Sequence, residues 1–317
     1  MIWVIIWLWW VVLADWRSAA SAKRDNKLNY ILLVITAAIW GFAFVAQRIG
    51  MQSLDPLSFN TVRFALGALF IKIISASKPP GSQTFPLAPG IVLFVAASLQ
   101  QIGVVYTTAG AAGFITGLYV VFVPLLGFWR GQKVGKRISL AVLLSLAGML
   151  LINRPDDLRV SFGNMLVLLS AVFWAIHVQL IDKLSKRYSV SELAFCQYAV
   201  CALLSFGGFI VLYLVKAPSY LISAQLAQNL SSAAWPVLYG GILSVGVAYS
   251  LQVKAQQKTE ASKAAIILCL EGVFALIGAR LILQESLGPK AIVGMLLMLM
   301  AMLIILIPNF LIDRNTA

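Results

Sequence analysis

Ten apolar segments, each between 15 and 23 residues long, follow one another along this chain with short polar links between them. None alternates polar and apolar residues with a period of two, and each exceeds the roughly ten residues of a membrane barrel strand. In a bilayer, only a helix satisfies all its backbone groups within one lipid-exposed segment. The chain is therefore predicted to be an all-α integral membrane protein with ten transmembrane helices, at residues 28–45, 57–76, 88–106, 110–129, 138–152, 163–181, 193–215, 234–252, 263–283 and 292–308.

The composition agrees with this prediction. Of 317 residues, 61% are hydrophobic and 11% are charged, too few charges to cover a water-facing surface. Ten spans of roughly 20 residues use nearly the whole chain, which leaves no room for a soluble catalytic domain. The net charge of +13 does not indicate nucleic-acid binding, because the Lys and Arg residues lie in short clusters between apolar runs, where they orient a membrane protein.

Those clusters also predict the topology. If both ends of the ten-helix set lie on one side, that side carries 17 Lys and Arg residues and the other carries 6. Positive residues concentrate on the cytoplasmic side. We therefore expect a multi-pass protein of the cell (inner) membrane, with both ends of the ten-helix core in the cytoplasm.

The segments outside the core have little functional content. Residues 1–27 are Trp-rich and apolar, then basic, and residues 309–317 form a short tail. Residues 1–13 carry no charge and are short for a span, so an interfacial anchor or an artefactual upstream start is preferred, ahead of a signal peptide or an eleventh span.

An internal repeat divides the core. Residues 107–122 and 259–274 align at an offset of 152, and seven of the sixteen aligned positions are identical. Similar matches pair the segment that ends at Trp40 with the one that ends at Trp174, and residues 148–152 with 301–305. The three pairs keep the same order, which indicates duplicated halves at 28–153 and 163–308, joined by a linker at 154–162. Because each half has an odd number of helices, the second copy is inverted, the arrangement common in alternating-access secondary transporters.

The chain resembles the EamA family of the drug/metabolite transporter superfamily. The resemblance covers roughly residues 28–308 and is carried by Ala38-Ile39-Trp40-Gly41, Arg63-Phe64, residues 107–126, residues 259–274 and Gln284-Glu285-Ser286-Leu287. It implies two inverted five-helix repeats and a central cavity lined by helices one to four and six to nine. The fifth and tenth helices would then be peripheral, which leaves a homodimer open.

Two departures from the family pattern stand out. Gln132-Lys133-Val134 replaces a glutamate-containing turn that the family often has after the fourth helix, whereas the second half keeps Glu285. In the ninth helix, Glu271-Gly272 stands where many members have a proline soon afterwards.

Charged side chains at bilayer depth are costly and mark candidate sites. Glu271 is the one acid deep within a predicted span, and Arg63 lies about two turns into the second span. Glu271 is a candidate for proton coupling or for binding a substrate amine, and Arg63 is expected to reach either Glu271 or a substrate carboxylate. The alternatives are a protonated or paired structural carboxyl and a snorkelling arginine.

Further polar and aromatic side chains lie in the same spans. Amides and a lone histidine can join helices by hydrogen bonds or bind a polar metabolite, and aromatic rings can pack or stack on a planar or cationic substrate. The remaining candidates are His177, Gln100, Gln101, Asn60, Trp40, Trp174, Tyr106 and Tyr119.

These observations favour a secondary transporter of a small organic metabolite, such as an amino acid, with coupling to protons as an option. The alternative is an integral membrane enzyme acting on a lipid or membrane-bound substrate, but one His and one deep acid do not form the cluster that such chemistry needs. No cofactor or metal site is expected, because the three cysteines lack ligand spacing and no ATP-binding loop occurs in the sequence.

Overall fold

The computed structural model describes residues 22–75, 86–128, 136–152, 158–216, 224–286 and 288–306. Within these ranges every regular element is helical. The elements are α2 (Ala22–Gly50), α3 (Pro56–Ile74), α4 (Leu87–Tyr106), α5 (Ala109–Thr116), α6 (Tyr119–Phe128), α7 (Lys136–Ile152), α8 (Leu158–Leu184), α9 (Val190–Lys216), α10 (Ala224–Ser232), α11 (Ala234–Leu238), the π-helix η3 (Tyr239–Tyr249), α12 (Ser250–Gln256), α13 (Ala261–Leu268), α14 (Glu271–Ile282) and α15 (Pro289–Leu306).

Seven stretches of the described chain are long and apolar enough to cross a membrane, which confirms the all-helical membrane class. They correspond to the first, second, third, sixth, seventh, eighth and ninth predicted spans. Their bounds are Lys27–Gly50, Pro56–Ile74, Leu87–Tyr106, Phe162–Leu184, Val190–Val215, Ala234–Gln256 and Ala261–Ile282, while Ala109–Val123 and Ile292–Ala301 are shorter apolar helices.

Two of the predicted spans are broken near their middle. The Leu118 N–H bonds to Ile115 O at 3.1 Å, three residues back, and this tight turn ends α5 before α6 begins. In the other half the Leu270 N–H bonds to Ile267 O at 3.2 Å, and the turn separates α13 from α14. Such tightened turns end a regular α-helix and redirect the chain, so each span consists of two short helices.

Side-chain caps start several of the helices. The Asp55 carboxylate accepts hydrogen bonds from the Leu57 and Ser58 N–H groups at the start of α3. Ser189 and Glu192 form a reciprocal capping box at the start of α9, with bonds of 3.0 and 3.2 Å.

The structure differs from the sequence analysis at two places, and part of the sequence analysis falls outside the described residues. Helix α8 begins at Leu158, inside the predicted linker 154–162. The short helix α10 was not predicted; it is amphipathic and precedes the eighth span. The segments 1–13 and 309–317 lie outside the described residues.

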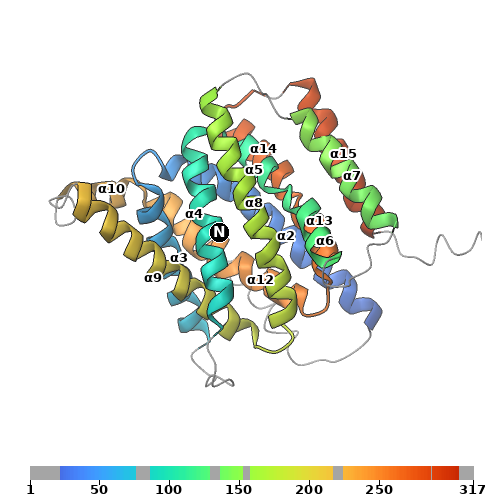
Figure 1. The fold of residues 1–317 in the computed structure, drawn as a ribbon, viewed down its shortest axis with the longest axis horizontal. Coiled ribbons are helices and arrows are strands. Elements are labelled where there is room, and N and C mark those ends of the chain that lie inside the picture. The colour runs from blue at the N-terminus through green and yellow to red at the C-terminus, as the bar shows by residue number, and fades with distance from the viewer. Residues whose placement is uncertain are drawn as a thin grey trace, which may run out of the picture.

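Helix α2 packs against α14, η3, α12 and α13 within the helical bundle shown in Figure 1. Helix α4 packs against α8, α3 against α9, and α14 against α2, while η3 contacts both α2 and α3. Helices α7 and α15 lie side by side at one edge of the bundle. The largest buried cluster joins side chains of α2, α3, α4, α8, α9 and η3, so the polar groups described next lie among tightly packed apolar ones.

Candidate substrate-binding cavity

A narrow cavity of about 30 Å³ lies between helices of both sequence halves. Ligand pockets usually enclose roughly 300–1,000 Å³, so a bound metabolite requires the helices that line this cavity to move apart. The cavity lining contains six of the residues expected from the sequence, namely Trp40, Arg63, Gln100, Tyr119, Trp174 and Glu271. The other lining residues are Ala43, Phe44, Gln47, Thr116, Val178, Ser244, Tyr249 and Gln252.

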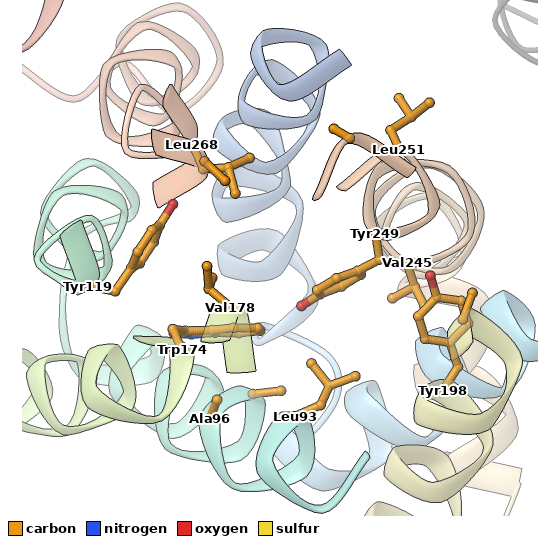
Figure 2. Close-up of a cluster of buried hydrophobic side chains, with 14 of the residues drawn as sticks. Leu93, Ala96, Tyr119, Trp174, Val178, Tyr198, Val245, Tyr249, Leu251 and Leu268 are labelled. Atoms are coloured by element: carbon orange, nitrogen blue, oxygen red, sulfur yellow. The ribbon is translucent and has the colours of Figure 1, made fainter. Parts of the chain in front are cut away.

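Aromatic rings form one wall of this cavity. The Tyr249 ring centroid lies 4.6 Å from that of Trp40 and 6.1 Å from that of Trp174, and the Trp174 and Tyr249 rings are nearly parallel, at 23°. The indole N–H of Trp40 donates to Ser244 O at 3.1 Å, which fixes its orientation. Figure 2 shows Tyr119, Trp174, Val178 and Tyr249 gathered around the same space. These rings offer flat apolar surfaces on which a ligand can stack.

Two opposite charges line the cavity without pairing. Arg63 and Glu271 are each 3% exposed, yet the ion pairs found among the described residues do not join them. Of the two partners expected for Arg63, Glu271 is therefore not contacted by an ion pair, and a substrate carboxylate stays a prediction. The Arg63 guanidinium carbon instead lies 4.8 Å from the Phe64 ring centroid and 5.5 Å from that of Phe59. Tyr249 lines the same cavity as both of these side chains.

Glu271 and Tyr119 occupy equivalent places in the two halves. Tyr119 is the first residue of α6 and Glu271 the first of α14, and the two positions differ by the same offset of 152 that relates the repeats. The two side chains lie close enough to interact. Neither Tyr119 Oη nor Glu271 Oε1 has a hydrogen-bond partner, however, so they are neighbours without a well-formed bond.

Four expected residues lie outside the cavity lining. His177 Nε2 bonds to Gln197 Oε1 at 2.7 Å, between α8 and α9, which matches the structural alternative for a lone histidine. Asn60 and Gln101 are fully buried. Tyr106 is 46% exposed and packs edge-on against Phe162, with 5.4 Å between centroids.

Sequence reasoning missed other lining residues. Gln252 carried a usable signal, because it is an amide within a predicted apolar span, whereas Gln47 lies two residues beyond the predicted first span and within the observed one. Each has a buried side-chain oxygen without a partner. Tyr249 carried no such signal. It ends the π-helix η3, and π-turns are frequent at functional sites but have no simple sequence pattern.

Metal ligands do not cluster in the part of the chain that the structure describes. No group of three or more His, Cys, Asp or Glu residues is placed there to hold an ion. The three cysteines, Cys196, Cys201 and Cys269, are buried with free thiols. The functional groups that line the cavity are one carboxyl group, one guanidinium group, amides, hydroxyl groups and aromatic rings.

A multi-pass helical protein whose central cavity carries polar and charged side chains is typical of membrane transporters. The chain belongs to the EamA-like transporter family, which it matches at residues 27–154 and again at 161–307.

Relatives and a solved structure agree with this class. An uncharacterized transporter of Archaeoglobus fulgidus is 31% identical over 91% of this chain and 89% of its own length. The uncharacterized transporter YoaV of Bacillus subtilis is 23% identical over 84% of this chain and 92% of its own. A crystal structure of another protein shares the fold, with a TM-score of 0.69 at 15% identity, over 94% of this chain and 100% of that one.

Proposed function

We propose that the chain forms ten spans in two inverted five-helix repeats, at 28–153 and 163–308. The broken pair α5–α6 would be the fourth span, with α7 and α15 as the fifth and tenth. The helix contacts support a pseudo-twofold relation, because the α4–α8 contact has a counterpart in α2–η3 and the α4–α9 contact in α3–η3. The breaks after Gly117 and Cys269 also fall at the offset of 152.

On this framework the protein is a secondary transporter that works by alternating access on a small organic zwitterion, such as an amino acid or a related solute. The observation that carries the proposal is the pair of buried, unpaired, opposite charges, Arg63 and Glu271, in one cavity. An ionised side chain deep in a membrane protein requires a partner. A ligand with an ammonium and a carboxylate supplies one to each, and the aromatic wall accommodates its apolar part.

Proton coupling follows from the same site. Glu271 can be neutralised either by a ligand ammonium or by a proton, so the two compete for one carboxylate. A proton that binds Glu271 on one side of the membrane and leaves on the other would then drive exchange of the ligand.

The transporter class is tested by solute flux. We expect purified protein in proteoliposomes to move at least one zwitterion from a metabolite panel, while matched amines without a carboxylate and acids without an amine move at least roughly tenfold more slowly, because each loses one charged contact. Flux of radiolabelled solutes, compared with protein-free vesicles, measures this. Absence of flux for every solute, together with turnover of a membrane lipid, would favour the enzyme alternative.

Cysteine labelling tests the inverted arrangement and the proposed cytoplasmic ends. We expect single cysteines within 154–159 to react with an impermeant thiol reagent added outside intact cells, and cysteines within 130–137 to react only after the cells are opened. The difference follows from the odd number of helices per repeat and from the charge bias. Reaction of both segments from one face would contradict the inverted topology.

A homodimer through α7 and α15 stays a prediction.

A further inference from the structure

Glu285 joins the end of one broken span to the start of the other. It follows α14, and its two carboxylate oxygens accept hydrogen bonds from the backbone N–H groups of Ala109 and Gly110 at 3.2 and 3.3 Å. Gln284 adopts a left-handed conformation, with φ of 57°, and the Glu285 N–H bonds back to Ala279 O at 3.1 Å. This turn directs the carboxylate onto the first turn of α5. A carboxylate there binds unsatisfied N–H groups and stabilises the positive end of the helix.

Other contacts between helices close the same end of the bundle. Thr107 Oγ1 donates to Asn164 Oδ1 at 2.7 Å, which joins the start of the fourth predicted span to α8. Arg48 Nη1 donates to Val104 O at 2.8 Å, which joins the end of α2 to α4. We call this end the Glu285 face, defined by Arg48, Thr107, Asn164 and Glu285.

The equivalent groups at the opposite end are not joined in this way. The offset of 152 pairs Thr107 with Thr259 and Thr108 with Glu260. Thr259 Oγ1 is buried and has no hydrogen-bond partner. The Glu260 side chain does not cap α13 and instead lies 3.2 Å from Lys263 Nζ, whereas the Thr108 hydroxyl does cap α5.

We propose that Glu285 is a positioning residue that holds the Glu285 face closed, so that the resting protein exposes its cavity to the opposite side of the membrane. The inference rests on the proposed alternating-access function. Among the described residues the two halves carry unequal locks, because Glu285 and Thr108 bond to the first turn of α5, whereas the side chains of Thr259 and Glu260 make no such bond at the start of α13. Opening the Glu285 face has to break charge-assisted hydrogen bonds, which are stronger than neutral ones. Glu285 thereby biases the equilibrium between the two states.

Access to the cavity can be measured without a transported solute. Ala43 lines the cavity, so full-length Ala43→Cys protein in oriented vesicles can be labelled with an impermeant maleimide from either face. We expect Glu285→Gln to raise the labelling rate from the Glu285 face by roughly tenfold, because a neutral amide weakens both bonds while keeping the side chain's size. The native cysteines are buried, and protein without the added cysteine gives their background rate.

Glu260→Gln is the matched control, because Glu260 precedes α13 in the other half and its carboxylate caps no helix. It should leave the labelling rate from the Glu285 face unchanged. Thr107→Val is a second variant that breaks the bond to Asn164 without touching Glu285, and it should also raise this rate; it decides the matter if Glu285→Gln does not fold.

Unchanged labelling in folded Glu285→Gln and Thr107→Val proteins would overturn the inference, as would an equal increase in Glu260→Gln. A failed transport assay does not affect this measurement. If no solute is transported while labelling still responds to Glu285, the proposed transport is wrong but the lock is supported.

Discussion

Glu271→Gln is expected to abolish the response of transport to a pH gradient. Glutamine keeps the size and polarity of the side chain but cannot exchange a proton or carry the charge that a ligand ammonium requires. The carboxylate is 3% exposed, lines the cavity and has no cationic partner among the described residues, so another group cannot readily replace it. The measurement is initial flux in proteoliposomes with and without an imposed pH gradient, for a solute identified by the metabolite screen.

The same substitution should also weaken the ligand. Losing a charged hydrogen bond costs about 1.5–3 kcal/mol, which corresponds to roughly a 10- to 150-fold rise in the ligand concentration needed for half-maximal exchange. Glu260→Gln, an exposed carboxylate at the start of α13, serves as the control and should behave like the wild type. A pH response that persists in Glu271→Gln would show that protons are coupled elsewhere or not at all.

Gly41→Ala is expected to lower stability strongly, because Gly41 of α2 packs directly against the backbone of α14. A Cβ at this position would overlap the Cβ of Phe274 and would lie 2.6 Å from the Glu271 carbonyl oxygen and 2.8 Å from the Ala275 nitrogen. Two of these atoms belong to the backbone, which cannot move aside as a flexible side chain can. Overpacking of this kind costs about 1–3 kcal/mol or more, and the displaced residue is Glu271 itself.

Gly207→Ala provides a matched control within the same chain. Gly207 lies on α9, also in a helix, and an added Cβ there has nothing within 4 Å. Because alanine favours a helix over glycine by about 0.5–1 kcal/mol, this variant should melt at or slightly above the wild-type temperature. Thermal unfolding of purified protein, followed by tryptophan fluorescence, compares the two. If Gly41→Ala melts with the wild type, the close contact between α2 and α14 is not the constraint that we infer.

The two charged residues of the cavity show how far sequence reasoning reaches. Glu271 and Arg63 could be identified beforehand, because an ionised group in an apolar span is costly enough to require a reason. Their separation could not be predicted. It depends on the rotation and tilt of α3 and α14, which place both side chains in the cavity lining. The place of Tyr249 in the cavity lining could not be predicted either, because a tyrosine within a membrane helix is common and does not by itself indicate a site.

The neighbouring amides Gln100 and Gln101 make the same point. Both carried the same signal, yet Gln100 lines the cavity and bonds to Thr116 Oγ1 at 2.9 Å, while Gln101 is fully buried outside the lining. Consecutive residues on a helix point about 100° apart. Which of the two faces the ligand is therefore decided by how α4 is rotated against its neighbours.

The sequence by itself determined the helical membrane class, the repeat offset of 152 and which charges lie at depth. These properties follow from local rules: a backbone in lipid must satisfy its own hydrogen bonds, and a buried charge must have a function or a partner. Only the tertiary structure decided that Tyr119 and Glu271 meet, that Arg63 and Glu271 do not pair, and that Glu285 reaches the start of α5. Each of these depends on contacts between residues more than 150 positions apart, and such contacts exist only once the helices have packed.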